Sequence, residues 1–233
     1  MPKKPKITVV LPTYNEKKSI RKCIDDFSRL GIIDEIIVVN NNAVRGTSGE
    51  IAKTKAIEIA EPVQGYGAAI RRGLSQAKGD YVVVCEPDGT FAARDLHKLL
   101  SYIQDFDFVI GTRTTNTLIW EGANMGFFMK WGNYFLGKMV EFLFNTTQLT
   151  DVGCTYRIIK RKALAKISKQ FQSNGSYFGL EMLILVIKNN IPFIQIPVNY
   201  KERIGESSVT GSKFKAIALA VQMFGLILRE RLW

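Results

Sequence analysis

Glu86 and Asp88, two carboxylates one residue apart, are the pattern in this sequence best suited to chemistry. They follow the apolar segment 81–85, whose β-branched residues indicate a buried strand. In an extended segment residues i and i+2 point to the same side, so both carboxylates would face one ligand. Carboxylate and phosphate oxygens suit Mg²⁺ and Mn²⁺. The pattern therefore predicts a Mg²⁺ or Mn²⁺ site at Glu86 and Asp88, the alternative being a plain acidic turn.

The segments around this pair predict an α/β fold with a mostly parallel sheet flanked by helices. Apolar, β-branched segments alternate with segments of helical spacing through residue 111, as in nucleotide-binding α/β folds. Open sheets of this kind bind ligands at the carboxyl ends of their strands. The glycines of 65–67 begin a helix, but Ile70 stands where a dinucleotide fingerprint needs a third glycine. The expected strands are 7–11, 34–39, 56–60, 81–85 and 106–111.

The second half of the chain is richer in aromatic residues. Segment 125–144 predicts a helix whose aromatic face either packs on the core or lies in a membrane interface. That face contains Phe128, Trp131, Phe135, Met139 and Phe142. A strand at 155–160, a helix at 177–189 and an extended edge segment at 191–200 follow. The apolar run 216–228 would form a helix about 20 Å long, shorter than the roughly 30 Å of a bilayer core.

The change of pattern divides the chain into parts. We predict one domain over 1–212, with a first half at 1–111 and a second half at 112–212. A C-terminal amphipathic helix would cover 213–233. No run approaches the ~20 apolar residues of a membrane-spanning helix, so we expect any membrane contact to be peripheral.

Charge limits the classes of partner. The chain has 32 Lys and Arg against 21 Asp and Glu, a net charge of +11, which favours nucleic acid, a phosphate-rich substrate or a membrane surface. The basic residues are spread along the chain without a recognised nucleic-acid motif, so no nucleic-acid partner is expected. The three cysteines lack disulfide or metal spacing, which favours a reducing compartment. His97, the single histidine, lies in a polar helical segment, so no histidine mechanism is expected.

Several segments resemble the inverting glycosyltransferases of family 2, of the dolichol-phosphate-mannose synthase type, which have the GT-A fold. The resemblance covers nearly the whole chain, and the order and spacing of its motifs carry it. The matching segments are 9–16, 35–42, 65–73, 86–88, 111–113, 151–157 and 197–208. Three positions depart from the family pattern: Glu86 replaces the first Asp of the DxD motif, Asn40 a common Asp, and Thr90 a frequent Gln.

On the donor side, the resemblance implies that 1–212 is a catalytic domain whose first half, 1–111, is the nucleotide-sugar-binding half, with a site for a UDP- or GDP-sugar. The end of the first strand would line the base and ribose, and the loop after residue 200 would close over the diphosphate. The residues assigned to this site are Pro12, Tyr14, Glu16, Asn40, Gly65, Arg71, Glu86, Asp88, Arg203 and Ser207. Glu86 and Asp88 would hold the metal.

On the acceptor side, the resemblance implies that 112–212 is the acceptor-binding half and that the acceptor is a polyprenyl phosphate such as dolichyl or undecaprenyl phosphate. Arg113 and Arg157 would hold its phosphate, and Trp131 would contact the acceptor. Asp88, Arg113, Arg203 and Asp151 are the expected catalytic residues. Transfer of a hexose would then invert the anomeric carbon at the cytoplasmic face of a membrane.

Other acceptors and roles stay open at this stage. A glycan or lipid-linked sugar hydroxyl would need a general base, for which Asp151 and Glu181 are candidates. A non-catalytic nucleotide-sugar-binding module is an alternative from another class, motivated by Glu86 and Asn40. A membrane protein or a second copy of the chain is a further candidate partner.

Overall fold

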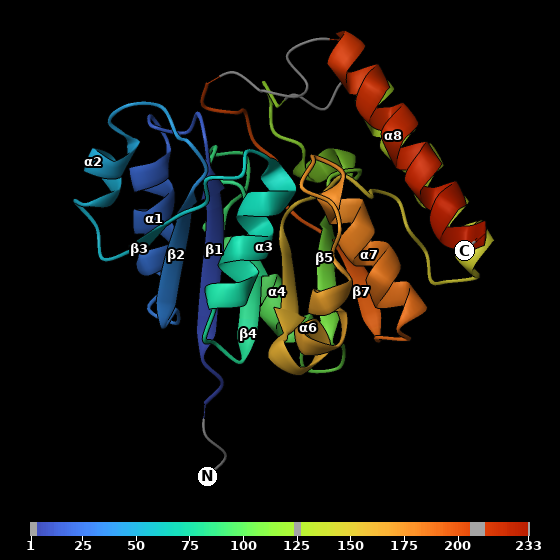
Figure 1. The fold of residues 1–233 in the computed structure, drawn as a ribbon, viewed down its shortest axis with the longest axis horizontal. Coiled ribbons are helices and arrows are strands. Elements are labelled where there is room, and N and C mark those ends of the chain that lie inside the picture. The colour runs from blue at the N-terminus through green and yellow to red at the C-terminus, as the bar shows by residue number, and fades with distance from the viewer. Residues whose placement is uncertain (1–3, 124–126, 206–212, 233) are drawn as a thin grey trace.

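The centre of the molecule is a seven-stranded sheet in the order β3-β2-β1-β4-β6-β5-β7 (Figure 1). The structure is a computed structural model that describes residues 4–123, 127–205 and 213–232. Strand β6 runs antiparallel to β4 and β5, and the other four neighbouring pairs are parallel. The predicted mostly parallel α/β fold is confirmed. The strands are β1 (Ile7–Thr13), β2 (Glu35–Asn40), β3 (Ile57–Ala60), β4 (Tyr81–Val84), β5 (Phe108–Thr112), β6 (Arg157–Lys160) and β7 (Phe193–Pro197).

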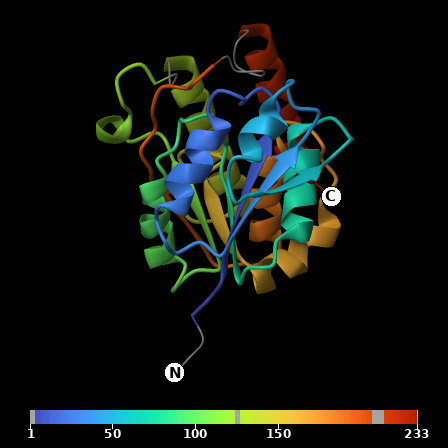
Figure 2. The same ribbon diagram turned by 90° about the vertical axis from the view of Figure 1, so that its left-hand side faces the viewer.

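Helices cover both faces of the sheet. Helices α3, α6 and α7 lie on one face, and α1 and α4 lie on the other (Figure 2). The helices are α1 (Ile20–Ser28), α2 (Thr47–Ile51), α3 (Tyr66–Gln76), α4 (Leu96–Tyr102), α5 (Phe127–Phe144), α6 (Arg161–Ile167), α7 (Phe178–Lys188) and α8 (Lys213–Leu232). Short 3₁₀ turns are η1 (Ala93–Asp95), η2 (Asn116–Leu118) and η3 (Ser168–Gln170). Helix α6 was not predicted from the sequence.

The central strands are apolar because both of their faces are covered. In β1 and β4, residues 9–11 and 82–84 are almost fully buried. Continuous apolar strands are expected where helices pack on both sides of a parallel sheet. The edge strand β3 is different, since Ile57 is half exposed. The carboxyl ends of β1, β2 and β4 therefore lie side by side at one edge of a well-packed sheet. The loops that follow these strands can be held in place there.

Helices α5 and α8 lie beside each other next to the β5 and β7 side of the sheet (Figure 1). The inner side of α8 buries Met223, Leu226 and Ile227, and α8 also contacts α7. The outer side of the pair is apolar and exposed. Trp131, Phe135 and Phe142 of the predicted aromatic face of α5 are exposed, whereas Met139 is partly buried against the core. The exposed large residues of the pair are Trp131, Tyr134, Phe135 and Phe142 on α5 and Phe214, Ile217, Val221, Phe224, Leu228 and Leu232 on α8. Within the described ranges, no helix combines the length and apolar character needed to cross a bilayer.

Candidate active site

The turn after β4 fixes Asp88 at the carboxyl edge of the sheet. Asp88 is 1% exposed, and its Oδ1 accepts hydrogen bonds from the backbone N–H of Thr90 at 2.9 Å and from Thr90 Oγ1 at 2.6 Å. Gly89 has φ +85°, a conformation that costs glycine little and other residues more. The other oxygen, Oδ2, is buried and makes no hydrogen bond with any described residue. One carboxylate oxygen is thus anchored by Thr90, and the other faces the guanidinium of Arg203.

The loop after β7 places Arg203 at this edge of the sheet. Its Nη1 lies 3.0 Å from Asp88 Oδ2 and 3.9 Å from Glu86 Oε2, and its Nη2 lies 3.4 Å from Glu16 Oε1. Backbone hydrogen bonds hold the loop in place, from Ile204 N to Asp88 O and from Lys201 N to Thr90 O, each 2.8 Å. The structure therefore brings together four predicted site residues that are up to 187 positions apart in the sequence.

Electrostatics at this edge are dominated by crowded carboxylates. Burial raises the pKa of Glu86 to about 8, with a further contribution from the charge of Asp88 and an opposing one from Arg203. Burial lowers the pKa of Arg203, but its attraction to Asp88, Glu86 and Glu16 outweighs burial and raises it. A cation at this position is therefore favoured, and an added divalent ion would favour the ionised form of Glu86.

The donor set suits Mg²⁺ or Mn²⁺ bound together with phosphate. Asp88 Oδ2 is a buried carboxylate oxygen without a hydrogen bond, and the partly exposed Glu86 carboxylate lies beside it. Both are hard oxygen ligands, and Mg²⁺ is usually held by one or two carboxylates with the remaining positions taken by phosphates and water. No group of three His, Cys, Asp or Glu residues that could enclose a metal occurs in the parts of the chain that the structure describes. Two carboxylates and an incoming diphosphate are the arrangement that fits.

The end of β1 forms the side of the site nearest β2. Pro12 is buried within β1, whereas Tyr14 is 41% exposed. Glu16 Oε2 accepts hydrogen bonds from the backbone N–H groups of Tyr14 at 2.7 Å and Asn15 at 2.9 Å, which leaves Oε1 toward Arg203. Glu16 therefore shapes the loop in addition to pairing with Arg203.

Asn40 is the last residue of β2, and its side chain makes hydrogen bonds within the protein. Its Nδ2 donates to Glu58 Oε1 at 2.7 Å and to Ser48 Oγ at 3.2 Å, and its Oδ1 accepts from the backbone N–H of Ala43 at 2.8 Å. An aspartate here would place two carboxylates against each other. The carboxamide at this position is thus matched to Glu58 on the neighbouring strand.

Gly65 and Arg71 lie on the first turns of α3. The backbone N–H of Gly65 donates to Asn41 Oδ1 at 2.8 Å, and a Cβ on Gly65 would lie 2.1 Å from the carbonyl oxygen of Asn174. Arg71 Nη1 donates to Asn174 Oδ1 at 3.0 Å and lines a hollow of about 690 Å³ between α3 and α6. The structure does not bring Arg71 to the carboxylates.

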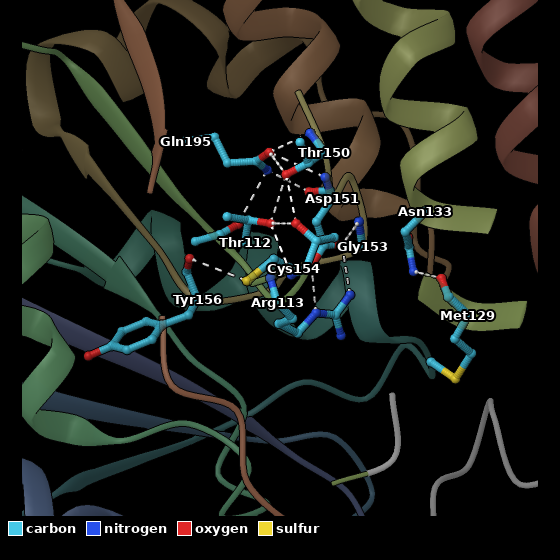
Figure 3. A network of polar contacts seen from close by, with 12 residues as sticks. Thr112, Arg113, Met129, Asn133, Thr150, Asp151, Gly153, Cys154, Tyr156 and Gln195 are labelled. Atoms are coloured by element: carbon cyan, nitrogen blue, oxygen red, sulfur yellow. Dashed lines mark hydrogen bonds and ion pairs between the residues drawn. The ribbon is translucent and has the colours of Figure 1, made fainter. Parts of the chain in front are cut away.

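Arg113 and Asp151 form a buried ion pair (Figure 3). Asp151 Oδ2 accepts from Arg113 Nε at 2.8 Å and from its backbone N–H at 2.9 Å, while Oδ1 accepts from Nη2 at 2.9 Å and from the backbone N–H of Gly153 at 3.0 Å. Burial lowers the pKa of Arg113, but the charge of Asp151 outweighs it and raises the pKa well above its usual value. The guanidinium also lies 5.3 Å from the ring centre of Tyr200. Each oxygen of Asp151 thus accepts two hydrogen bonds, from Arg113 and Gly153.

Two other predicted residues, Arg157 and Trp131, have different surroundings. Arg157 is 2% exposed and donates to the carbonyl oxygens of Gly179 and Cys154, so it holds interior backbone and is not presented to a bound acceptor. Trp131 is 52% exposed on α5 and stacks edge-on with Tyr134. Ser207 lies outside the described residues.

Comparison with known proteins gives the family. Residues 8–168 match the family described as Glycosyl transferase family 2. The chain belongs to this family. The predicted family and enzyme class, a glycosyltransferase, are therefore confirmed.

Relatives of this family 2 chain come from archaea and other organisms. It is 26% identical over 211 residues to a low-salt glycan biosynthesis hexosyltransferase of Haloferax volcanii, covering 88% of this chain but only 50% of that protein, so the chain spans half the length of this relative. It is 28% identical over 209 residues to a dolichyl-phosphate hexose transferase of the same organism, covering 87% and 86%. Both are distant relatives.

A solved structure supports the fold. Glucosyl-3-phosphoglycerate synthase from Mycobacterium tuberculosis, in complex with Mn²⁺, UDP and phosphoglyceric acid, is similar with a TM-score of 0.77 at 19% identity, over 97% of this chain and 78% of that one. Another structure of that enzyme contains Mg²⁺ and UDP. At this identity the likeness establishes the predicted GT-A type of fold, and the activity is argued separately below.

Sequence reasoning on this family 2 chain missed some residues that organise the site. Gln195 on β7 accepts from the backbone N–H groups of Thr150 at 2.7 Å and Asp151 at 3.2 Å, and it donates to the carbonyl oxygens of Asp151 at 2.7 Å and Gly111 at 3.3 Å (Figure 3). The signal was a lone amide within the apolar strand 193–197. Glu181, the other candidate base, is buried and accepts from the backbone N–H groups of Gln172 and Ser173, so it is structural.

Proposed function

We propose that this family 2 glycosyltransferase transfers a hexose from a UDP- or GDP-sugar to a polyprenyl phosphate, with inversion and with Mg²⁺ or Mn²⁺. The observation that carries the donor half is the contact of Arg203 with Asp88, Glu86 and Glu16 at the carboxyl edge of the sheet. A nucleoside diphosphate leaves with growing negative charge on its β-phosphate. An arginine fork stabilises such charge bidentately.

In this proposal the two carboxylates bind the metal ion and Arg203 contacts the diphosphate. Glu86 and Asp88 would hold the divalent ion, which supplies positive charge to the diphosphate. Arg203 is carried on a loop fixed to Asp88 and Thr90 by backbone hydrogen bonds, so its guanidinium stays at the diphosphate side of the edge. Thr90 fixes the orientation of the Asp88 carboxylate, because its backbone N–H and its hydroxyl both donate hydrogen bonds to Oδ1.

The acceptor half of the proposal rests on Asp151 and on the relatives. A phosphate acceptor is already largely ionised at neutral pH, since its second pKa is near 6, and needs no base to attack. The oxygens of Asp151 accept hydrogen bonds from Arg113 and Gly153, and buried Glu181 accepts them from backbone N–H groups. Neither candidate base is therefore available to a hydroxyl acceptor. The name of one relative, a dolichyl-phosphate hexose transferase, points to the same acceptor class.

Transfer of radioactive sugar into an organic-phase lipid tests this proposal. Purified protein is incubated with UDP-[¹⁴C]glucose or GDP-[¹⁴C]mannose, undecaprenyl or dolichyl phosphate, and Mn²⁺ or Mg²⁺. We expect label in the organic phase with a lipid phosphate and none with the matching dephosphorylated alcohol. Label in the alcohol instead would favour a hydroxyl acceptor, and the absence of label from every donor would overturn the proposed donor classes.

A further inference from the structure

The segment that carries Asp151 is held to the sheet by side chains. Residues 147–155 lie between α5 and β6, and they make no backbone–backbone hydrogen bond with any residue that the structure describes. The N–H and C=O groups of such a segment must pair with side chains or with water. The direction of the Asp151 carboxylate therefore depends on which side chains hold the segment in place.

Gln195 on β7 binds both peptide groups of Asp151 (Figure 3). Its Oε1 accepts from the backbone N–H of Asp151 at 3.2 Å, and its Nε2 donates to the carbonyl oxygen of Asp151 at 2.7 Å. Oε1 also accepts from the backbone N–H of Thr150 at 2.7 Å, and Nε2 donates to the carbonyl oxygen of Gly111 at 3.3 Å. The Thr150 hydroxyl lies 2.9 Å from that of Thr112, but this contact involves neither peptide group of Asp151. One side-chain amide thus replaces a neighbouring strand for this segment.

The partners of Gln195 require a group that both accepts and donates hydrogen bonds. The two N–H groups need an acceptor and the two carbonyl oxygens need a donor, and a carboxamide supplies both without a charge. The rest of the strand Phe193–Pro197 is apolar, and an amide placed there costs free energy unless it is hydrogen-bonded. A carboxylate of the same size could accept but not donate, and a leucine could do neither.

Asp151 in turn sets the direction of the Arg113 guanidinium. Its two oxygens accept from Nε at 2.8 Å and from Nη2 at 2.9 Å, so one edge of the planar guanidinium is aligned with the carboxylate. A Cβ on Gly153 would lie 2.9 Å from Nη2, so the segment also packs closely against the guanidinium. With the edge formed by Nε and Nη2 bound to Asp151, Nη1 is turned away from that carboxylate.

We infer that Gln195 is a positioning residue, which holds Asp151 and through it directs Arg113 toward the acceptor phosphate. The inference rests on the proposed function for the ligand of Arg113, and it adds a residue outside every segment that resembles the family. Strand β7 pairs with β5, with Ile110 opposite Gln195. Arg113 follows β5 and Arg203 follows β7. The amide therefore lies between the two strands whose loops carry the proposed acceptor and donor arginines.

Hydrogen exchange at Arg113 Nε–H tests this orientation without any substrate. NMR spectra of the ¹⁵N-labelled chain contain the resonance, which is assigned by its loss in Arg113→Lys. In Gln195→Leu and Gln195→Glu we expect this exchange to become about tenfold faster, the effect of losing roughly one hydrogen bond. Arg161 Nε–H is the internal control, because it donates to the carbonyl oxygen of Gly79, just before β4, at 2.8 Å. Its exchange rate should not change.

Steady-state kinetics separate positioning from a loss of folded protein. In Gln195→Leu, KM for the lipid phosphate should rise about tenfold, whereas kcat and KM for the sugar nucleotide should change less than about twofold. A loss of folded protein alone would lower the apparent kcat and leave both KM values unchanged. Gln170→Leu is the matched control, since it removes an amide in η3 that donates to the carbonyl oxygen of Lys166 at 2.9 Å. If Gln195→Leu does not fold, Gln195→Glu, which keeps the size and the acceptor oxygen, is used for both measurements.

The outcomes distinguish the role of Gln195 from the proposed function. Equal acceleration of exchange at Arg113 and Arg161, or no acceleration at either, would overturn the positioning role. A fall in kcat alone, or a rise in KM for the sugar nucleotide alone, would also overturn it. If exchange accelerates only at Arg113 but the unaltered chain transfers no sugar to a lipid phosphate, the proposed function fails, while Gln195 still orients Arg113.

Discussion

Arg203 Nη1 lies 3.0 Å from Asp88 Oδ2, the buried carboxylate oxygen at the strand edge that makes no hydrogen bond. A guanidinium and a divalent ion on the same oxygen would repel each other. Arg203 and the metal should therefore compete for Asp88 until a diphosphate gives the guanidinium an alternative partner. This relationship makes donor and metal binding interdependent.

Replacing Arg203 by Met should strengthen metal binding while weakening catalysis. Without the neighbouring positive charge, Mn²⁺ affinity measured by electron paramagnetic resonance without nucleotide should rise several-fold, and kcat should fall about 10²–10³-fold through loss of a charge-stabilising donor. Lys201→Met is the matched control, because it removes a positive charge from the same loop and the Lys201 ammonium lies over the Trp120 ring at 4.7 Å. Unchanged Mn²⁺ affinity in Arg203→Met would refute the competition.

The two carboxylates should differ in their tolerance of substitution. Asp88→Ala removes the anchored ligand and should abolish turnover and donor-linked metal binding, whereas Glu86→Asp keeps a carboxylate and should keep activity. Thr90→Val should lie between them, since it removes the 2.6 Å hydrogen bond that orients Asp88 but leaves the backbone one. Turnover with each variant across a Mn²⁺ titration measures this order. Full activity of Asp88→Ala, or of the unaltered chain in EDTA, would contradict the metal-dependent mechanism.

The raised pKa of Glu86 predicts a pH dependence of metal binding. The carboxyl must lose its proton to bind a cation, so Mn²⁺ affinity should rise up to tenfold per pH unit as pH approaches about 8 and level off above it. Glu86→Gln should show little of this dependence over the same range. Isothermal titration calorimetry between pH 6 and 9 measures it. A flat profile for the unaltered chain would show that Glu86 is already ionised at pH 6.

The raised pKa of Glu86 also predicts that folding stability falls with rising pH, whereas metal affinity rises. In the folded chain Glu86 keeps its proton up to about pH 8, while its ordinary value is 4.5, so the folded state binds more protons between these values. The contribution of Glu86 to the free energy of unfolding must then fall as pH rises through that window. Without metal, the melting temperature of Glu86→Gln relative to the unaltered chain should accordingly increase from pH 5 to pH 8.

The fold could be predicted because its elements have local signals. Alternation of apolar strands with helices gave the parallel half, and the pair at Glu86 and Asp88 marked the ligand edge. Helix α6 was missed because its sequence of seven residues, Arg161–Ile167, is too short and basic to show a clear apolar period. Strand boundaries differed by one or two residues, as for the expected strand 106–111 and the observed β5 (Phe108–Thr112).

The contacts across the site were less predictable than the elements. Arg113 and Arg157 each end a segment that resembles a family motif, 111–113 and 151–157. Arg157 nevertheless binds backbone carbonyls, and Arg113 binds Asp151. Arginine type and spacing do not distinguish a ligand contact from a structural one, because the partner comes from another part of the chain. The role of Gln195 was hidden for the same reason, since its partners are 44 to 84 residues away.

Asp151 is expected to act through stability and through Arg113. Asp151→Ala leaves the Arg113 guanidinium buried without a partner, which typically costs about 3–5 kcal/mol of unfolding free energy. Urea denaturation measures this loss. Arg113→Lys keeps a charge but loses the two-pronged contact, and it should chiefly raise KM for the lipid phosphate. If Asp151→Ala lost activity at unchanged stability, a general base would be indicated instead, and an effect of Arg113→Lys on the donor KM alone would contradict its acceptor role.

The outer side of α5 and α8 should bring the site to a lipid surface. Four apolar side chains on this side are 63–85% exposed: Phe135 and Phe142 on α5, and Phe214 and Val221 on α8. Single exposed apolar residues are common on protein surfaces, but a group of them marks an interaction site. Basic residues lie at both ends of α8. Interfacial helices combine such an apolar face with basic residues, each worth roughly 1 kcal/mol near an anionic membrane.

Charging this outer side should release the protein from vesicles without unfolding it. Phe135→Glu with Val221→Glu places two carboxylates on exposed positions, so the melting temperature should hardly change while sedimentation with vesicles of phosphatidylglycerol and phosphatidylcholine falls. UDP or GDP binding should persist, because the proposed nucleotide site lies at the ends of β1 and β4. Leu226→Glu is the contrasting variant, since this side chain is 4% exposed and its charge should destabilise α8. Failure of the unaltered chain to sediment, or equal sedimentation of the double variant, would show that something other than lipid covers this surface.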